Sequence, residues 1–249
     1  MQKLSFIFSF ALLFGLWGLV TAMGGWSNQV FPGPMQVFRS MGELISNGTL
    51  LEHSVASLYR VTVGFYLAAI LGIPLGILLG RLQGLYFLID PLIQFLRPIS
   101  PLAWIPLAML WFGIGDQPAV FLIFLASFFP LVVGTTISVR SIPDVYFQVA
   151  ANFCFSRMEL VSKIILPAIV PDVITSLRLT VSIAWLVVVA AEMIAVQSGL
   201  GYLILDSRNA LRMDYVMVGM IVIGIIGVLL DWVMVRMSRM ESASWRKGH

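Results

Sequence analysis

The sequence predicts an all-α integral membrane protein with six transmembrane helices and both termini in the cytoplasm. Three observations predict this. Hydrophobic residues make up 59% of the 249 residues and charged residues only 11%, whereas soluble domains carry about 25% charged residues. Apolar runs of the length needed to cross about 30 Å of hydrocarbon recur along the chain. The basic residues gather in alternate connecting segments.

The first predicted span runs from Leu4 to Ala22 and follows Lys3. A cleaved signal peptide is the alternative, but the apolar core of a signal peptide is usually about 7–15 residues, shorter than this run. A segment rich in glycine and proline comes next, followed by an amphipathic stretch that reaches Glu52. This pattern predicts a loop and a surface helix. We therefore expect residues 1–55 to form the first helix and a periplasmic amphipathic segment.

Five further spans are expected within a membrane core that extends from residue 56 to residue 237, with a polar tail at 238–249. They lie at about 53–80, 85–114, 119–139, 173–196 and 215–235. Glycines in the second span allow a neighbouring helix to approach closely. The third span is expected to be broken by prolines, which remove backbone donors: Pro91, Pro98, Pro101 and Pro106. A short surface helix is expected between residues 197 and 214.

The connecting segments differ in charge, which predicts the orientation. Nine basic residues fall on the side of both termini: Lys3, Arg81, Arg140, Arg157, Lys163, Arg236, Arg239, Arg246 and Lys247. Three fall on the other side: Arg39, Arg208 and Arg212. Short loops rich in lysine and arginine stay in the cytoplasm. The polar stretch 140–171 is therefore predicted to be cytoplasmic.

The sequence lacks the residues that several classes of function require. The single cysteine, Cys154, and two distant histidines, His53 and His249, argue against a metal site. A phosphate-binding loop ending in Gly-Lys-Ser/Thr is absent, so we expect no ATPase site and no cofactor on this chain. Nucleic-acid binding has no support, because the sequence shows no basic face with interleaved aromatic residues. An intramembrane enzyme would need a nucleophile and a base at membrane depth, and a secondary transporter would normally show an inverted repeat.

Ionisable residues in or near the apolar spans are candidate functional residues, because a charge at the bilayer centre costs at least about 2.5 kcal/mol. They are Arg60, Asp90, Arg97, Arg178, Glu192 and Asp231. Arg60, Asp90, Arg178 and Asp231 lie near span ends, where pairing or snorkelling suffices. Glu192 is expected to pair with an arginine of another helix or to cap the loop that follows it.

Arg97 precedes Pro98 in the broken third span, where freed carbonyl groups must face protein or water. A cation at such a break is suited to attract an anion. The predicted translocation pathway comprises Arg97, Ser100, Trp104, Trp185 and Glu192. Structural pairing is the alternative role for the arginine, and packing against lipid or protein is the alternative for the two tryptophans.

The stretch 148–167 resembles the cytoplasmic signature of importer permeases of the ATP-binding-cassette class. That signature reads Glu-Ala-Ala, three residues, Gly, nine residues, Ile, one residue, Leu-Pro. The residues at its positions are Gln148, Val149, Ala150, Cys154, Ile164, Leu166 and Pro167. The spacing matches throughout, while Gln148, Val149 and Cys154 replace the usual Glu, Ala and Gly. Because a residue with a side chain resists positive φ, we expect the bend at Cys154 to use ordinary dihedral angles, beside Ser156.

Other stretches resemble the branch of this family that imports taurine, alkanesulfonates, nitrate and bicarbonate. They are RPISPLAWIPLAMLWFGIGD from Arg97, VVVAAEMIA from Val187, SGLGYLI from Ser198, FPGPMQVF near the start and VGFYLAAILGIPLGILLGR in the second span. The resemblance covers about Phe31 to Met237.

The resemblance implies the fold of type I importer permeases and a multi-pass location in a bacterial inner membrane. It implies a homodimer, two ATPase subunits that hold ATP and magnesium, and a periplasmic or lipoprotein solute-binding protein. A small oxyanion would move by alternating access, and helices within 144–166 would couple it to the ATPases. The implied coupling residues are Gln148, Val149, Ala150, Phe153, Cys154, Ser156, Arg157 and Pro167. The alternatives are an amphipathic helix resting on the lipid interface and a secondary transporter or channel for a small anion.

Overall fold

The computed structural model describes residues 2–25 and 30–245, with side chains placed for residues 12–25 and 30–236. Every regular element in these ranges is a helix. The elements are α1 (Gln2–Met23), α2 (Pro34–Ser46), α3 (Thr49–Arg81), α4 (Gln83–Leu96), η1 (Pro101–Trp104), α5 (Ile105–Phe112), α6 (Asp116–Arg140), α7 (Asp144–Asn152), α8 (Arg157–Leu160), η2 (Val161–Ile165), α9 (Leu166–Ala195), α10 (Leu200–Asn209) and α11 (Met213–Trp245). The predicted all-α class is confirmed.

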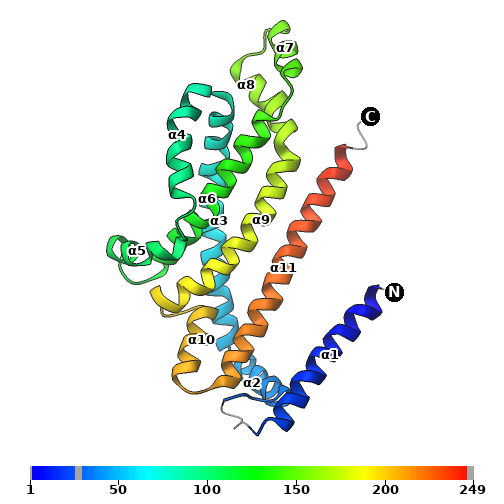
Figure 1. Cartoon of the computed structure of the whole chain (residues 1–249), viewed down its shortest axis with the longest axis vertical. Coiled ribbons are helices and arrows are strands. Elements are labelled where there is room, and N and C mark those ends of the chain that lie inside the picture. Colours follow the sequence, from blue (N-terminus) through cyan, green and yellow to red (C-terminus); the bar gives the residue numbers. More distant parts are fainter. Residues whose placement is uncertain (1, 26–29, 246–249) are drawn as a thin grey trace.

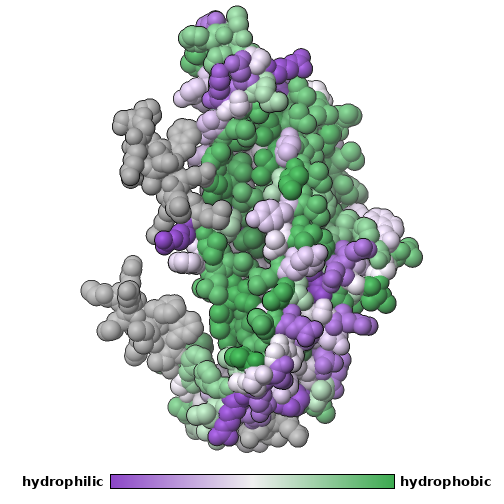
Figure 2. Space-filling view, turned by 180° about the vertical axis from the view of Figure 1, so that it is seen from behind, coloured by the Kyte–Doolittle hydropathy of each residue, from purple (hydrophilic) through white to green (hydrophobic). Residues whose placement is uncertain are grey.

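Four helices are long and apolar enough to cross a membrane: Thr49–Arg81, Asp116–Arg140, Arg157–Ala195 and Met213–Arg236. The bent pair α4 and α5 adds a fifth span if it is counted as one. The long helices lie roughly side by side, with α7 and α8 at one end and α2 and α10 at the other (Figure 1). An apolar band separates ends that carry more hydrophilic side chains (Figure 2). The molecule therefore has the surface of a membrane protein.

The first predicted span coincides with α1, which reaches from Gln2 to Met23. Its side chains are described only from Leu12 onward, and Leu12–Met23 is an apolar helix shorter than a span. The sixth membrane crossing therefore stays a prediction of the sequence. At the other end, α11 continues to Trp245, beyond the predicted start of the polar tail, and residues 246–249 lie outside the described residues.

The third span is broken as predicted, although not at every proline. The axes of α4 and the helical segment 101–112 differ by 87°. Pro98 and Pro101 lie at this bend, and Pro101 occupies the first turn of η1, where its missing N–H is not needed. Pro91, in contrast, lies inside α4, and the helix continues past it. The predicted break at Pro91 is therefore wrong.

The close contact between α3 and α6 forms the centre of the bundle. Small residues recur every four positions along α3: Gly64, Ala68, Gly72, Gly76 and Gly80. A Cβ added at Gly76 would lie 2.6 Å from the Cβ of Thr135, and one at Gly64 would lie 2.7 Å from Ile123. Such spacing lets two backbones approach in lipid, where helices associate by packing. The predicted role of these glycines is confirmed.

The fifth span begins earlier than predicted. The sequence predicts a polar stretch that ends at Pro171, but a continuous helical segment runs from Arg157 to Ala195. Ser156 starts it with a capping box, in which its hydroxyl accepts from the Glu159 N–H and its own N–H donates to Glu159. Pro171 lies inside the helix. The segment is 39 residues long, about 58 Å at 1.5 Å per residue, so it projects well beyond the hydrocarbon.

Candidate functional site

The helix α7 lies at the end of the molecule, past the ends of α4 and α11 (Figure 1). Asp144 occupies its first turn, where a carboxylate is favoured by the helix dipole. One of its faces packs on the bundle: Ala150 is only 2% exposed, and Phe147 contacts the apolar cluster that contains Val139 and Ile169. Ala150 and Phe147 therefore anchor α7 to the bundle in this arrangement, and the role of Ala150 in contact with an ATPase stays a prediction.

The opposite face of α7 is apolar and exposed. The exposed fractions are 63% for Val145, 57% for Tyr146, 45% for Val149 and 72% for Phe153. These four residues are called the outer face of α7 below. Gln148 is also exposed, at the edge of this face. An apolar face at the end of the molecule, beyond the bundle, marks a surface that a partner or a lipid interface covers.

The bend after α7 is made by Cys154 itself. Its φ is +51°, so the expectation of ordinary dihedral angles is wrong. The Cys154 and Phe155 N–H groups donate to the carbonyl groups of Ala151 and Ala150, which closes the end of the helix as glycine usually does. Cys154, Ser156 and Arg157 are exposed in this segment. Pro167 lies in the first turn of α9.

Two arginines hold the ends of α3 and α6 against neighbouring rings. The Arg81 guanidinium lies 4.1 Å from the centroid of the Phe147 ring, and the Arg140 guanidinium lies 4.0 Å from that of Tyr86. Cations over aromatic faces are attracted by about 0.5–2 kcal/mol. Arg81 thereby connects α7 directly to the end of α3.

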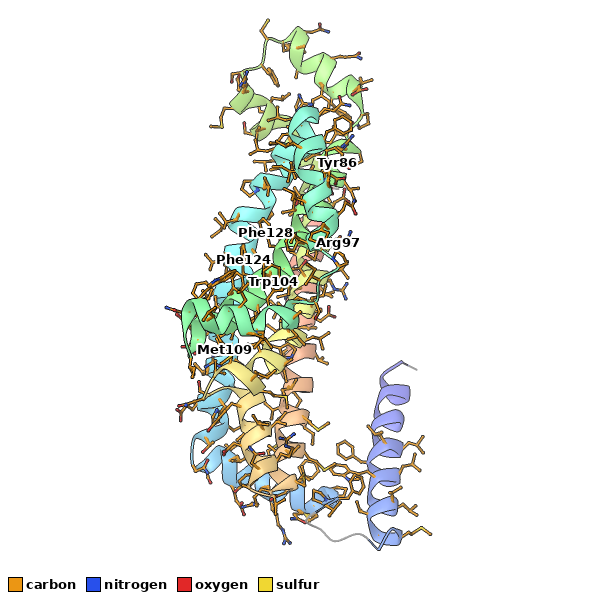
Figure 3. The ribbon with its side chains drawn as sticks, turned by 60° about the vertical axis from the view of Figure 1, so that its left-hand side comes forward. Tyr86, Arg97, Trp104, Met109, Phe124 and Phe128 are labelled. Carbon is orange, nitrogen blue, oxygen red and sulfur yellow. The ribbon has the colours of Figure 1, made fainter. Side chains whose placement is uncertain are left out.

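Arg97 and Trp104 line the same cavity, of about 220 Å³, between the bend and α6 and α9. Figure 3 shows both side chains beside the bend. Ser100 directly precedes η1 and is exposed. Among the residues that the structure describes, Arg97 forms no ion pair and no side-chain hydrogen bond, and it is exposed. The predicted pair of Arg97 and Trp104 is thus brought together at one place.

Trp185 lies elsewhere. It is 5% exposed, and its indole N–H donates to the Ile223 carbonyl of α11 at 3.0 Å. Its ring packs against Gly227, where a Cβ would lie 3.2 Å away. Trp185 therefore joins α9 to α11 and does not line the cavity of Arg97, which is the packing alternative considered for it.

Glu192 forms a buried ion pair at the α10 end of the bundle. Its Oε1 lies 2.6 Å from Nη1 of Arg60, and the two side chains are 0% and 1% exposed. Arg60 also pairs with Asp116 at the start of α6, at 2.6 Å, and donates to the carbonyl and the hydroxyl of Ser198. One guanidinium thus connects α3, α6, α9 and the loop before α10. Glu192 does not line the cavity that Arg97 and Trp104 share.

Glu192 also caps the first turn of α10, so both expectations for Glu192, a pair with an arginine and a cap on the loop that follows it, are met. The N–H groups of Gly199, Leu200 and Gly201 donate to His53 Nδ1, Ser57 Oγ and Glu192 Oε2, at 2.9, 2.9 and 3.0 Å. A side chain at Gly199 or Gly201 would collide with Glu192. The sequence analysis missed His53, Ser57 and Asp116. The spacing of residues 53, 57 and 60 on one face of an apolar helix was the available signal.

One more predicted pair of charged residues is present, and a metal-binding cluster is absent from the described residues. Arg178 of α9 donates to both carboxylate oxygens of Asp231 of α11, at 2.8 and 3.1 Å, so these two residues pair, as expected. In the part of the chain that the structure describes, no three histidine, cysteine, aspartate or glutamate side chains gather closely enough to hold a metal ion.

Comparison with known proteins places the chain in a family. The family model for the binding-protein-dependent transport system inner membrane component matches residues 72–242. The chain is 35% identical over 239 residues to a putative aliphatic sulfonates transport permease protein of Bacillus subtilis, covering 96% of this chain and 86% of that protein. It is 34% identical to the taurine transport system permease protein of Escherichia coli, covering 89% and 82%. It is 37% identical to a nitrate import permease protein of Synechocystis, covering 92% and 89%.

A solved structure has the same fold. An inward-facing conformation of the MetNI methionine ABC transporter aligns with a TM-score of 0.66 at 18% sequence identity, covering 81% of this chain and 97% of that chain. The fold described above is therefore that of a chain whose relatives are permeases. The protein is a multi-pass inner membrane protein that belongs to the ABC transporter permease family of binding-protein-dependent transport systems.

Proposed function

We propose that this permease imports a small oxyanion, with a sulfonate such as taurine as the first candidate and nitrate or bicarbonate next. Transport is driven by separate ATPase subunits, which bind ATP and magnesium and contact the permease through α7 and the segment that follows it, within residues 144–166. The observation that carries the coupling half of this proposal is the exposed apolar outer face of α7.

The geometry of α7 favours a protein partner over a lipid interface. Its inner face is fixed to the bundle by Ala150 and by the contact of Arg81 with Phe147, so a force on α7 is transmitted to α3. The adjoining helical segment Arg157–Ala195 is continuous with a membrane span. A helix that lays apolar residues into a groove is a common mode of recognition. ATP-driven closure of two ATPases would therefore move α7 and the attached spans together.

The cavity of Arg97 supports an anionic solute. An unpaired guanidinium at membrane depth is costly unless it faces water or a ligand, and arginine binds oxyanions by paired N–H donors. Relatives named for aliphatic sulfonates, taurine and nitrate all carry anionic or zwitterionic solutes with such oxygens. Trp104 forms an apolar wall beside the cation.

The complex we propose contains two copies of this chain, two ATPases and a periplasmic or lipoprotein solute-binding protein. The excess of lysine and arginine in the loops at its end of the molecule supports a cytoplasmic position for α7. The end that carries α2 and α10 then faces the binding protein. The capped and buried first turn of α10 holds this helix rigidly, and its exposed residues Asp206, Arg208 and Asn209 supply the surface that we assign to that protein.

The contact with the ATPase is tested by co-purification. Val149→Asp places a charge on the outer face of α7, whereas Ala151→Asp places the same charge on an exposed residue of the same helix, outside that face. We expect the ATPase subunit to be recovered with wild type and with Ala151→Asp, and to be lost with Val149→Asp. Equal recovery with both variants would refute the proposed contact.

The anion proposal is tested at Arg97 in the reconstituted complex. Arg97→Gln should reduce uptake of labelled taurine by about tenfold or more, because a desolvated charge-assisted hydrogen bond is worth about 1.5–3 kcal/mol. Arg97→Lys should retain part of the uptake. Stimulation of ATP hydrolysis by a binding protein loaded with a sugar or a cationic amino acid, and not by one loaded with a sulfonate, would contradict the oxyanion assignment.

A further inference from the structure

The helix α4 carries a polar stripe through an otherwise apolar sequence. Between Leu85 and Arg97, the residues able to form hydrogen bonds through their side chains are Tyr86, Asp90, Gln94 and Arg97. At 100° per residue they fall within an arc of about 80°. The residues on the other side of the helix are apolar and exposed, including Leu88 at 71% and Leu92 at 59%. The helix is thus amphipathic in a part of the protein that lies within the membrane.

The stripe faces a groove between α4 and α6. Tyr86, Asp90 and Gln94 line a cavity of about 410 Å³, whose α6 wall includes Thr136 and Arg140. Arg97 lines the next cavity along the same two helices. Figure 3 shows Tyr86, Arg97 and Trp104 in succession along this side of the molecule. Polar side chains at membrane depth face water or protein, and here they follow one another from the central bend to the α7 end.

A second cation lies at the far end of the groove. Arg140 is exposed, lies over the Tyr86 ring, and forms no ion pair among the residues described by the structure. The hydroxyl of Thr136 donates to backbone carbonyl groups, so Arg140 and Tyr86 supply the available donors at this end, whereas Gln94 lies about 12 Å along α4 from Tyr86, within one turn of Arg97. Asp90 stands between Arg97 and Arg140, and its carboxylate opposes an anion that rests between them.

We propose that the stripe lines the cytoplasmic half of an aqueous route and that Arg140, with Tyr86, forms a second binding site for a small oxyanion at its exit. The assignment of the anion rests on the proposed function. Two arginines separated by a carboxylate form two distinct weak sites, and multi-site binding of this kind lets a solute leave as readily as it enters. Arg140 is adjacent to the segment that leads into α7, so the exit lies beside the proposed coupling helix.

Cysteine modification tests the route directly. Cys154 is the single cysteine, so a Cys154→Gly background leaves one introduced thiol per chain. In the complex with its ATPase, in inside-out membrane vesicles, Asp90→Cys and Gln94→Cys should react with a membrane-impermeant sulfonate-bearing thiol reagent. Leu88→Cys and Leu92→Cys, on the opposite face of α4, should react at least about tenfold more slowly, because the thiolate does not form in lipid. Equal rates on the two faces, or no reaction on either, would overturn the route.

The second site is tested by the charge of the reagent. At Asp90→Cys, which lines the same cavity as Arg140, Arg140→Gln should lower the ratio of anionic to cationic reagent rates by about tenfold, as expected for the loss of a nearby unit charge in a partly screened site. Arg140→Lys should preserve the ratio, which separates loss of charge from misfolding. An unchanged ratio in Arg140→Gln would overturn the second site. These rates do not depend on which solute is carried, so uptake assays that fail for taurine would refute the proposed function and leave the route standing.

Discussion

At the scale of single residues, the pair of Arg60 and Glu192 shows how a charge becomes tolerable inside the bundle. Glu192 accepts hydrogen bonds from Arg60, Ser57 and the Gly201 N–H. Its carboxylate is thus almost fully satisfied, and the guanidinium is satisfied by Asp116 and Ser198 as well. A buried ion pair of this kind holds its helices in one arrangement. Removing only one of the two partners leaves the other as an uncompensated buried charge.

Removing one partner of this pair should be strongly destabilising. Arg60→Ala should lower the free energy of unfolding by about 3–5 kcal/mol, because Glu192 then stays buried without its cation. Lys163→Ala breaks an exposed pair with Glu159 and should cost about 0.2–1 kcal/mol. Thermal unfolding of the purified variants measures both. The double variant Arg60→Met/Glu192→Leu should lose less than Arg60→Ala, and a larger loss would contradict the uncompensated charge as the cause.

The backbone at Cys154 gives a second prediction. A left-handed conformation costs a residue with a side chain about 1–2 kcal/mol. Glycine avoids this cost, but its greater freedom in the unfolded chain offsets part of the gain. Cys154→Gly should therefore raise the melting temperature by about 2–4 °C relative to Cys154→Ala, as about 1 kcal/mol does in a chain of this size. Both variants remove the same sulfur. Equal melting temperatures would show that the positive φ carries no strain.

At the scale of elements, the bundle depends on the close approach of α3 and α6. Gly76→Val should destabilise the protein by about 1–3 kcal/mol, since the added methyl groups meet Thr135 and force the two helices apart. Gly84→Ala, at a helical position with open space around it, should be neutral or stabilising by up to about 1 kcal/mol. Melting temperature and the yield of folded protein measure the difference. A similar response of the two variants would contradict this packing.

The sequence predicted some of these elements correctly and missed the limits of others. Apolar length predicted the long helices, and the prolines of the third span predicted its bend, although they did not show that the helix continues past Pro91. Period and spacing did not separate the inner face of α7 from its outer face, because Ala150 and Phe147 are as apolar as Val145 and Val149. The fifth span was placed too late because Ser156 and Glu159, which start its helix, read as polar loop residues.

At the scale of the whole molecule, the network at Arg60 could not be predicted, since it joins residues 53–60, 116, 192 and 198–201 across four elements. The sequence indicated only that Glu192 needed an arginine or a backbone cap, and both are present. Trp185 was a candidate for the pathway with packing as the alternative, because the sequence does not show which neighbours a tryptophan of a membrane helix contacts. The family resemblance, by contrast, was specific over most of the chain and is confirmed.

In the function that we propose, the molecule as a whole joins an anion route to a coupling surface through long continuous helices. The cavity of Arg97 lies at the bend of the third span, and α7 connects through Arg81 to the end of α3. If α7 transmits the ATPase cycle, then damage to its outer face should stop transport without disturbing the distant ion pair. The melting temperature of Val149→Asp should accordingly stay within about 2 °C of wild type, because exposed substitutions change stability by less than about 0.5 kcal/mol.

The most direct test is uptake of labelled taurine by proteoliposomes that contain this permease, its ATPase and its binding protein. Uptake should require both ATP and the binding protein, should be abolished by Val149→Asp, and should persist with Ala151→Asp. Uptake that proceeds without ATP, or that is unaffected by Val149→Asp, would contradict a permease driven through the outer face of α7.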